Sequence, residues 1–409
     1  MRVVHLCNLS LPADHPDAGR LATHPGRWVL NLALAQRSYA AIKPLLVVQV
    51  PGAADNHEAE IEGIPVRFIA APSRFRALTL FHFDARRLAR AVLACEPDVV
   101  HAHGTEDAYL LAAQATGRPY IVTAQGLYSQ INSVMPPKPF SRAWVIERIE
   151  RHSLSKARHI VAKSEYVADW LSETYPHAAI HRIPNTFDPR ILQIRAQGRA
   201  PGSIAFVGSI DERKGLHLLA DAVERANGGL LKQTTDSAAS GPDAHRRSPP
   251  AARGALHIFG NRDEGASAYE SRVIGRLRAQ LGVRLILHGV VPSDELFRRL
   301  AGVELLVAPS LEEMFGNQVI EALLLGTWPI VSSRTAMEEN VRRVGAGTVF
   351  KNNDAASLAA AIPEAFAAQA AWNRAATRDA VNAWMGQAPV ARAHSDLYQR
   401  ILEEWTRRQ

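Results

Sequence analysis

Two glutamates, Glu313 and Glu321, flank a Phe-Gly pair in the segment SLEEMFGNQVIEALLLG. The run VELLVAPS that leads into it is apolar and predicts a strand, while Gly326 predicts the end of the helix that follows. Glu313 then lies in the loop and Glu321 about one turn into the helix. Because an ionised carboxylate only accepts hydrogen bonds, the two side chains suit hydroxyl groups, for example a ribose diol at Glu321 and another sugar at Glu313.

The residues between the glutamates add an anion-binding element. Gly316 lets a ligand approach the backbone closely, and Gly316 or Asn317 is the expected cap of the helix. The first N–H groups of a helix have no partner within it, so they can bind phosphate or sugar oxygens. A helix with acids near its positive end would explain Glu321 alone, but it leaves the order P-S-x-x-E-x-F-G-x-x-x-x-E-A unexplained.

Two cations lie in a second segment, FVGSIDERKGL. Gly208 ends a predicted strand and Lys214-Gly215 opens a predicted helix, so Arg213 and Lys214 lie near a helix N-terminus. Together they could hold a diphosphate and neutralise it as a leaving group. Two exposed basic residues in a turn are the simpler alternative. The segment has neither the dinucleotide-binding nor the P-loop glycine pattern.

A pair of histidines, His101 and His103, lies in the run DVVHAHG. Side chains two apart on a strand face the same way. A metal site would need a third ligand, and none is evident, so no metal site is predicted. We expect one of the two histidines to be near a bound acceptor. Thr105 is the predicted cap of the next helix.

These residues need a scaffold of alternating strands and helices. Apolar runs such as 98–104 and 119–126 predict strands, and residues 26–40 and 164–175 predict helices. The alternation indicates parallel α/β sheets, in which ligands bind beyond the carboxyl ends of the strands. It restarts after a linker rich in proline and glycine, which predicts two doubly wound domains, 1–186 and 202–387, and a final helix over 388–409. Residues 228–253 predict a disordered insertion, because they are rich in Ser, Ala, Gly and Pro.

Composition narrows the class of protein. The chain has 409 residues, a net charge of +7 and two cysteines. It has no run of membrane-spanning length, its first residues are too quickly polar to predict a secretory signal, and the sparse cysteines suit a reducing cytoplasm. The arginines are scattered, which argues against nucleic acid binding. Basic clusters over 86–90 and 138–158 could touch an anionic membrane surface, although a solvated basic surface is the simpler explanation.

The full pattern resembles the retaining GT-B glycosyltransferases of family 4 (group 1). The glutamate segment matches the family's P-S-x-x-E-G-F-G-x-x-x-x-E-A, with Met314 in place of the usual glycine. Further matches in family order are IVAKSEYVADWL, IPNTFDP, VGSIDERKG, GVVPSDEL and GTWPIVSS. The resemblance implies two Rossmann-like domains that face a cleft, and a final helix that packs back on the first domain.

The resemblance also implies substrates and roles. A nucleotide-diphospho-sugar would bind the second domain and a saccharide or lipid-linked acceptor the first, and sugar transfer with retention would need no metal ion or cofactor. Lys214 would bind the diphosphate with help from Arg213, Glu321 the ribose, and Glu313 the sugar. The remaining implied donor-site positions are Gly208, Ser209, Phe315, Gly316, Asn317 and the backbone near Val290. The implied acceptor-side residues are Gly26, His103 and Gln125.

Three departures from the family pattern keep other functions open. Ser209 follows Gly208 where the family often has arginine, Gln125 replaces a common histidine, and Ala336-Met337 replaces a glycine pair. A catalytically impaired protein that binds sugar nucleotides is therefore one alternative. A GT-B epimerase or phosphorylase is another. The leading prediction is a cytoplasmic glycosyltransferase of polysaccharide or glycolipid biosynthesis, with contact at the inner membrane face as an option.

Overall fold

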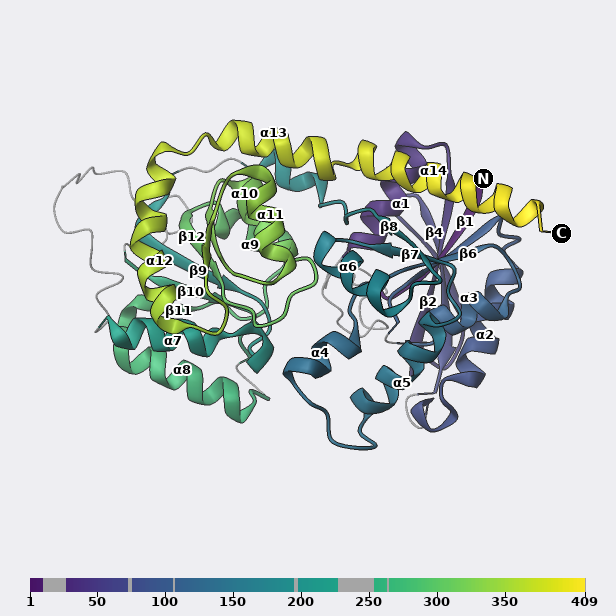
Figure 1. The fold of residues 1–409 in the computed structure, drawn as a ribbon, viewed down its shortest axis with the longest axis horizontal. Helices are drawn as coiled ribbons and strands as arrows, with labels where there is room; N and C mark the ends of the chain where they lie inside the picture. The colour runs from purple at the N-terminus through teal and green to yellow at the C-terminus, as the bar shows by residue number, and fades with distance from the viewer. Residues whose placement is uncertain are drawn as a thin grey trace. The chain divides into compact units, whose positions relative to one another are not determined.

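The computed structural model describes residues 1–9, 27–72, 76–105, 107–194, 198–226, 254–262 and 265–408. The chain divides into two compact units, which are Met1–Asp188 with Ala383–Gln409, and Pro189–Asn382. Each unit is built on a largely parallel sheet with helices packed on it (Figure 1). Gly26 and the predicted disordered insertion at 228–253 lie outside the described residues.

The first unit contains an eight-stranded sheet in the order β3-β4-β2-β1-β5-β6-β7-β8. Its described strands pair in parallel except for the antiparallel pair β3–β4. The strands are β1 Arg2–Cys7, β2 Lys43–Pro51, β3 His57–Ile61, β4 Ile64–Ala71, β5 Val99–His103, β6 Tyr120–Thr123, β7 His159–Ala162 and β8 Ala179–Arg182.

Helices cover this sheet, and the last helix of the chain is one of them. The helices of the unit are α1 Trp28–Tyr39, α2 His82–Leu93, α3 Tyr109–Ala115, α4 Tyr128–Val134, α5 Arg142–Leu154, α6 Glu165–Thr174 and α14 Gln387–Thr406. Helix α14 packs against α1, and its residues Leu397 and Tyr398 join a core that contains Val99 and Ile121 of the sheet (Figure 1). The two free cysteines, Cys7 and Cys95, are also buried here.

The second unit contains a six-stranded sheet in the order β11-β10-β9-β12-β13-β14, with parallel pairing between its described strands. The strands are β9 Ala200–Val207, β10 Leu256–Phe259, β11 Leu285–Leu287, β12 Val303–Ala308, β13 Trp328–Ser332 and β14 Thr348–Phe350. The helices are α7 Leu216–Arg225, α8 Ala268–Leu281, α9 Ser293–Leu300, α10 Asn317–Leu325, α11 Ala336–Val344, α12 Ala355–Ala368 and α13 Arg374–Met385, the last of which runs across the boundary between the units.

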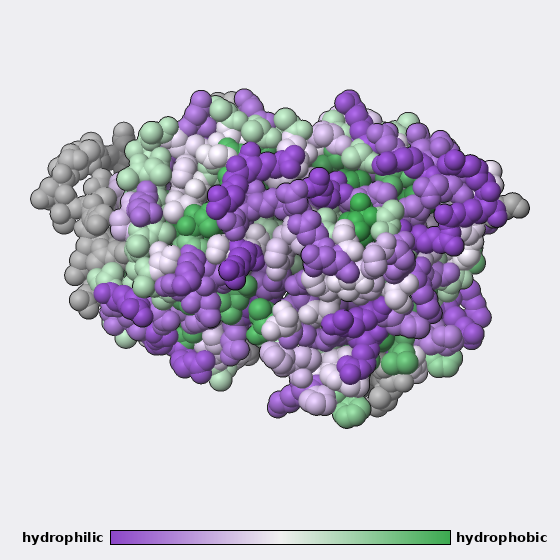
Figure 2. Space-filling view, in the orientation of Figure 1, coloured by the Kyte–Doolittle hydropathy of each residue, from purple (hydrophilic) through white to green (hydrophobic). Residues whose placement is uncertain are grey.

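The predicted α/β class is confirmed. The sequence features that predicted its strands and helices correctly have clear physical causes. Strand β13 is buried along its whole length, as expected of a parallel strand covered on both faces. Helix α9 has acids in its first turn and arginines in its last turn, the order that the helix dipole favours. Among the described residues, no helix is long and apolar enough to cross a membrane. On the face drawn in Figure 2, hydrophilic residues predominate and apolar residues lie in small, separate groups.

The prediction for Thr105 was wrong. Helix α3 begins at Tyr109 with Ala108 at its N-cap, and Thr105 donates instead to the buried carboxylate of Glu150, at 2.6 Å. The same carboxylate accepts hydrogen bonds from the backbone N–H groups of Tyr128 and Ser129, both at 2.9 Å, which are the first residues of α4. The hydroxyl of Thr105 therefore donates to a carboxylate that is distant in sequence and does not cap the helix that follows it.

Candidate functional site

The first group of predicted residues lies where β9 and β12 end in the second unit. These strands are neighbours, so the loops that follow them lie at the same edge of the sheet. The backbone N–H of Leu311 donates to the carbonyl of Arg213 at 2.7 Å. Gly215 has a positive φ of 69°, and a Cβ atom there would be 2.0 Å from the carbonyl oxygen of Pro309. Only glycine therefore permits this contact between the loops.

An ion pair joins the two loops. Nζ of Lys214 lies 2.5 Å from Oε2 of Glu313, and each side chain keeps only 14% of its exposure. Arg213 donates to the backbone carbonyl of Glu312 at 3.3 Å, so it also lies against the second loop. The structure thus brings Arg213 and Lys214, predicted to hold the diphosphate, and Glu313, predicted to hold the sugar, into one cluster.

The turn before Lys214 is fixed by Asp211. Its carboxylate accepts from the backbone N–H of Lys214 at 3.0 Å and from the hydroxyl of Ser209 at 2.7 Å. Ser209 is therefore tied to the same turn that presents Lys214. Gly208 lies beside the aliphatic stem of Lys214, since a Cβ atom at Gly208 would be 3.7 Å from Cδ of the lysine.

Glycines also connect the loops that follow β10 and β11. The N–H of Gly260, after β10, donates to the carbonyl of Gly289 at 2.7 Å, and a Cβ atom at Gly260 would be 2.2 Å from the carbonyl oxygen of Gly208. The buried side chain of Asn261 accepts from the N–H of Gly289 at 2.7 Å. Val290 follows this contact and is 80% exposed. Asn261 was not predicted, although a polar residue directly after the apolar run ALHIFG was a usable signal.

The start of α10 has the cap that the sequence predicts. Gly316 is the N-cap with a φ of 82°, and a Cβ atom there would be 2.5 Å from Cγ of Met337. Phe315 is buried, and its carbonyl accepts from Nδ2 of Asn340 at 2.6 Å. Asn317, the first residue of the helix, is exposed, and Glu321 lies one turn further on and is partly exposed.

Met337 belongs to the Ala336-Met337 pair that replaces two glycines of the family pattern. The N–H of Ala336 donates to the carbonyl of Glu313 at 3.0 Å, and Met337 packs against Gly316. The pair therefore supports the backbone on both sides of the Phe-Gly turn.

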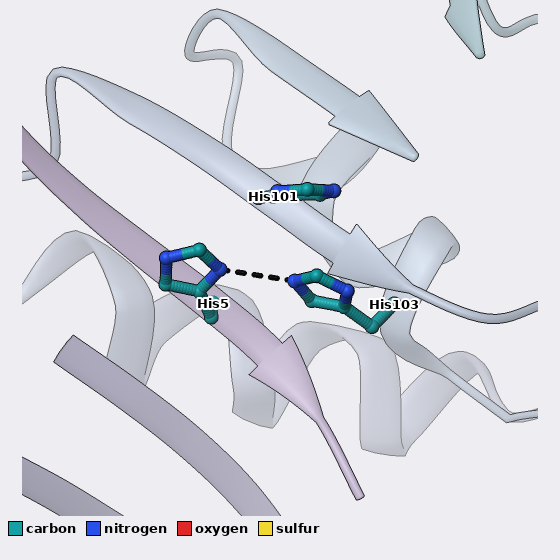
Figure 3. Close-up of side chains that lie close together, drawn as sticks. All are labelled: His5, His101 and His103. Carbon is teal, nitrogen blue, oxygen red and sulfur yellow. Dashed lines mark hydrogen bonds between the residues drawn. The ribbon is translucent and has the colours of Figure 1, made fainter. Parts of the chain in front are cut away.

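A second group gathers in the first unit. His101 and His103 face the same side of β5, as predicted, and His5 of β1 lies beside them (Figure 3). Nδ1 of His5 lies 2.9 Å from Nε2 of His103, and the rings of His101 and His103 stack with their centroids 3.9 Å apart. All three are buried. Burial lowers the pKa of His5 to about 3 and lowers the pKa values of His101 and His103 well below 6.5.

Other side chains complete this network. Nε2 of His5 bonds Oε1 of Gln36 at 2.9 Å. His101 bonds the hydroxyls of Tyr398 and Thr123, both at 2.7 Å. Because each ring nitrogen of His5 and His101 has a protein partner, the cluster is a hydrogen-bond network rather than an open set of metal ligands. The sequence missed His5, which provides the third histidine, because β1 and β5 are far apart in the chain.

Gln125 follows β6 at the same edge of this sheet. Nζ of Lys163 donates to the backbone carbonyl of Gln125 at 2.7 Å and to its Oε1 at 3.1 Å. Gln125, His103, Thr123 and His394 are among the residues that line a cavity of about 10 Å³. Two predicted acceptor-side residues, His103 and Gln125, are thus brought together, while the third, Gly26, is not described.

Comparisons with known proteins identify the family of the chain. The model of the family Glycosyltransferase Family 4 matches residues 26–190, and the model of the family Glycosyl transferases group 1 matches residues 201–367. A curated relative, 2-deoxystreptamine N-acetyl-D-glucosaminyltransferase of Streptomyces fradiae, is 24% identical over 390 residues, which cover 88% of this chain and 86% of the relative.

Solved structures show the same fold. Sucrose-phosphate synthase of Thermosynechococcus elongatus aligns with a TM-score of 0.73 at 18% identity, over 98% of this chain and 99% of the other. Anabaena HepE in complex with UDP and glucose aligns with a TM-score of 0.65 at 15% identity, over 98% and 100%. Fold and site thus define a glycosyltransferase of the GT-B type. Within that class, the chain belongs to the family 4, group 1 glycosyltransferases.

Proposed function

We propose that this glycosyltransferase moves a sugar from a nucleotide-diphospho-sugar to a hydroxyl group of an acceptor, with retention of the anomeric configuration. The observation that carries the proposal is the cluster of Arg213, Lys214 and Glu313 at the carboxyl ends of β9 and β12. Two cations and a carboxylate this close together would suit the charges and hydroxyl groups of one diphospho-sugar.

The donor would lie across the loops that follow β9, β11 and β12. Lys214 and Arg213 would hold the diphosphate, Glu313 the hydroxyls of the sugar, and Glu321 those of the ribose. The N–H groups at the start of α10, near Phe315, would face the phosphates. Gly208, Ser209, Gly316 and Asn317 would line the same donor site, with the base against the backbone near Val290.

In the proposed reaction, the bond between the anomeric carbon and the β-phosphate oxygen breaks, and the acceptor oxygen bonds the same carbon on the same face. The departing phosphate oxygen takes the proton of the acceptor hydroxyl. Lys214 and Arg213 stabilise the negative charge that develops on the diphosphate. The reaction then needs no side-chain nucleophile and, in this proposal, neither a metal ion nor another cofactor.

The acceptor is proposed to be a saccharide or a lipid-linked saccharide in polysaccharide or glycolipid assembly. A lipid-linked acceptor would bring the protein to the inner face of the membrane, and a soluble one would keep it in the cytoplasm. Phe140 supports a membrane contact because it is 83% exposed and lies beside Trp144 in a basic segment. The curated relative is named for 2-deoxystreptamine, so an aminocyclitol is a second class of acceptor.

The test is a thermal-shift screen of the full chain with UDP-, GDP- and ADP-sugars, with and without EDTA. The true donor should raise the unfolding temperature, because a ligand that binds only the folded state stabilises it. The selected donor is then incubated with saccharide, lipid-linked and aminocyclitol acceptors. NMR of the product should show the same anomeric configuration as the donor sugar.

Each alternative predicts a different result. Inversion at the anomeric carbon would contradict the proposed mechanism, and loss of transfer in EDTA would contradict metal independence. Tight donor binding without hydrolysis or transfer would favour a protein that only binds sugar nucleotides. Conversion of the free nucleotide sugar to an epimer, or phosphate-dependent cleavage, would favour the epimerase or phosphorylase alternative.

A further inference from the structure

The buried histidines of the first unit belong to a hydrogen-bonded chain that ends at a cavity. The chain joins β1, β5, β6, α1 and α14 and includes His103, His5, Gln36, Tyr398, His101 and Thr123. Both end members, His103 and Thr123, line the cavity of about 10 Å³. That volume is near the lower limit for one water molecule, so a single hydroxyl group fits it and a sugar ring does not.

In the part of the hydrogen-bonded series that runs from Gln36 to His103, the direction of each hydrogen bond follows from Gln36. Its Oε1 can only accept, so Nε2 of His5 carries a proton and donates to it, at 2.9 Å. Nδ1 of neutral His5 is then an acceptor, and it receives the N–H of Nε2 of His103 at 2.9 Å. Nδ1 of His103 is left as an unprotonated acceptor. Among the described residues, this buried nitrogen has no hydrogen-bond partner.

The other part of the hydrogen-bonded series, from Gln36 through Tyr398 to Thr123, holds the amide of Gln36 in place. Nε2 of Gln36 donates to the hydroxyl of Tyr398 at 3.0 Å. That hydroxyl then donates to Nδ1 of His101, at 2.7 Å, so Nε2 of His101 donates to the hydroxyl of Thr123, at 2.7 Å. Tyr398 therefore determines, through Gln36 and His5, which nitrogen of His103 carries the proton.

Further groups that line the cavity suit a neutral hydroxyl. A lysine ammonium only donates, so the bond from Lys163 fixes Oε1 of Gln125 and leaves the amide N–H groups as donors. Nδ1 of His394 donates to the carbonyl of Val390 at 3.0 Å, so Nε2 of His394 is an acceptor. Burial lowers the pKa of His394 to about 4 and keeps its ring uncharged at neutral pH. A hydroxyl group can use both donors and acceptors, whereas an anion would meet unprotonated nitrogens.

We propose that Nδ1 of His103 accepts a hydrogen bond from one hydroxyl group of a carbohydrate substrate in this cavity, and that Tyr398, Gln36 and His5 hold His103 in the tautomer that makes this possible. The proposal rests on the proposed glycosyl transfer for the source of the hydroxyl, which is either the acceptor or the transferred sugar. His103 binds the substrate, and Tyr398 acts on it through other residues as a positioning residue.

The tautomer is tested first, without any need for activity. The full chain with ¹⁵N-labelled histidine rings is examined by NMR, and His103→Leu assigns the signals of His103. We expect a neutral ring with the proton on Nε2. In Tyr398→Phe, Gln36 and His101 lose their common partner, so the form with the proton on Nδ1 should appear. Tyr109→Phe is the matched control, because it removes the hydroxyl of another fully buried tyrosine in the same unit.

Two results would overturn the positioning role. One is a proton on Nδ1 of His103 in the wild-type protein. The other is a His103 spectrum that is the same in Tyr398→Phe and in Tyr109→Phe. Addition of myo-inositol or glucose to the wild-type protein should shift the Nδ1 resonance of His103, and an unchanged resonance up to saturating polyol would contradict binding of a hydroxyl at this nitrogen.

The substrate is tested by kinetics with the donor that the thermal-shift screen selects. His103→Leu should lower kcat/KM by about tenfold, the effect of one lost hydrogen bond, and His103→Asn should restore part of it because its amide oxygen also accepts. A rise in KM for the acceptor with unchanged donor hydrolysis assigns the hydroxyl to the acceptor. A rise in KM for the donor during hydrolysis assigns it to the transferred sugar.

The outcomes separate the two proposals. Normal kinetics of both His103 variants, with an active wild-type protein, would overturn the hydroxyl site and leave the glycosyl transfer intact. A wild-type protein that neither hydrolyses nor transfers any tested sugar would overturn the proposed function. The NMR measurements would then still decide whether His103 is held as an acceptor and binds a polyol.

Discussion

Lys214 and Glu313 neutralise each other across two loops, and this has a consequence for ligand binding. Both side chains are mostly shielded from water, so an isolated charge at either position would be costly. A diphosphate beside Lys214 would have to share the lysine with Glu313 or take it over. The pair would thereby keep the cation positioned until a donor arrives.

This pairing predicts different effects of two substitutions on the binding of a nucleoside diphosphate. Lys214→Met should weaken binding by about 1.5–3 kcal/mol, the value of a charge-assisted hydrogen bond. Glu313→Gln should leave binding unchanged or strengthen it, because the lysine is released to the phosphates, and should lower sugar transfer. Calorimetric titration with the UDP, GDP or ADP that matches the selected donor measures both effects. Equal affinity for both variants and the wild-type protein would contradict the assigned roles.

At the scale of elements, the turn into α7 depends on glycine for two separate reasons. Gly215 has a positive φ, and its Cα faces the carbonyl of Pro309 in the loop after β12. Gly345, which ends α11, has a similar φ of 63°, but a Cβ atom there would meet nothing within 4 Å. Substitution of Gly345 therefore tests backbone strain alone, whereas substitution of Gly215 tests backbone strain together with a steric clash between loops.

Gly345→Ala should lower the free energy of unfolding by about 1–2 kcal/mol, the cost of a left-handed conformation for a residue with a Cβ atom. Gly215→Ala should cost clearly more, because the new Cβ would also displace the loop that carries Glu313. It should weaken donor binding as well, whereas Gly345→Ala should not. Urea unfolding and the thermal-shift assay measure these effects, and equal losses in both variants would contradict the importance of the contact with Pro309.

The elements also show what the sequence could and could not predict. Continuous apolar runs identified buried parallel strands such as β13, and glycines identified both ends of α10. Strand β3 was missed because its segment, HEAEI, is polar and half exposed, and its pairing with β4 holds it at the sheet edge. No local signal separates such an edge strand from a loop.

Within the candidate site, the sequence predicted the correct local structure where one segment contained the signal, and the roles of these residues stay predictions. The order of Glu313, Gly316 and Glu321 lies within one loop and one helix. The histidine network joins His5 near one end of the chain to Tyr398 near the other, and only the folded sheet brings them together. Such long-range partners cannot be recognised from one sequence.

At the scale of the whole molecule, the buried histidines make stability depend on pH. Burial lowers the pKa of His5 to about 3 and that of His394 to about 4, and it lowers those of His101 and His103 as well. Below pH 6.5 the unfolded chain binds protons at these positions and the folded chain does not. The free energy of unfolding should therefore fall with acidification below pH 6.5, and His5 and His394 should each contribute about 1.4 kcal/mol per pH unit down to about pH 4.

Two buried carboxyl groups oppose this trend. Burial raises the pKa values of Asp107 and Glu150, so the folded chain binds their protons more readily over part of the same range. The histidines outnumber them, and the net effect of acid should be a loss of stability. Calorimetry at pH 7 and pH 5 measures it, and His394→Leu should reduce the loss. The same pH dependence in His394→Leu and the wild-type protein would contradict this account.

Cys7 gives the sheet that bears these histidines a built-in reporter of local opening. It ends β1 with no exposed surface, and burial raises the pKa of its thiol far above its ordinary value. Because only a thiolate reacts readily with alkylating reagents, Cys7 is chemically silent while β1 stays paired with β2 and β5. Its rate of modification therefore measures how often this part of the sheet separates, without any added label.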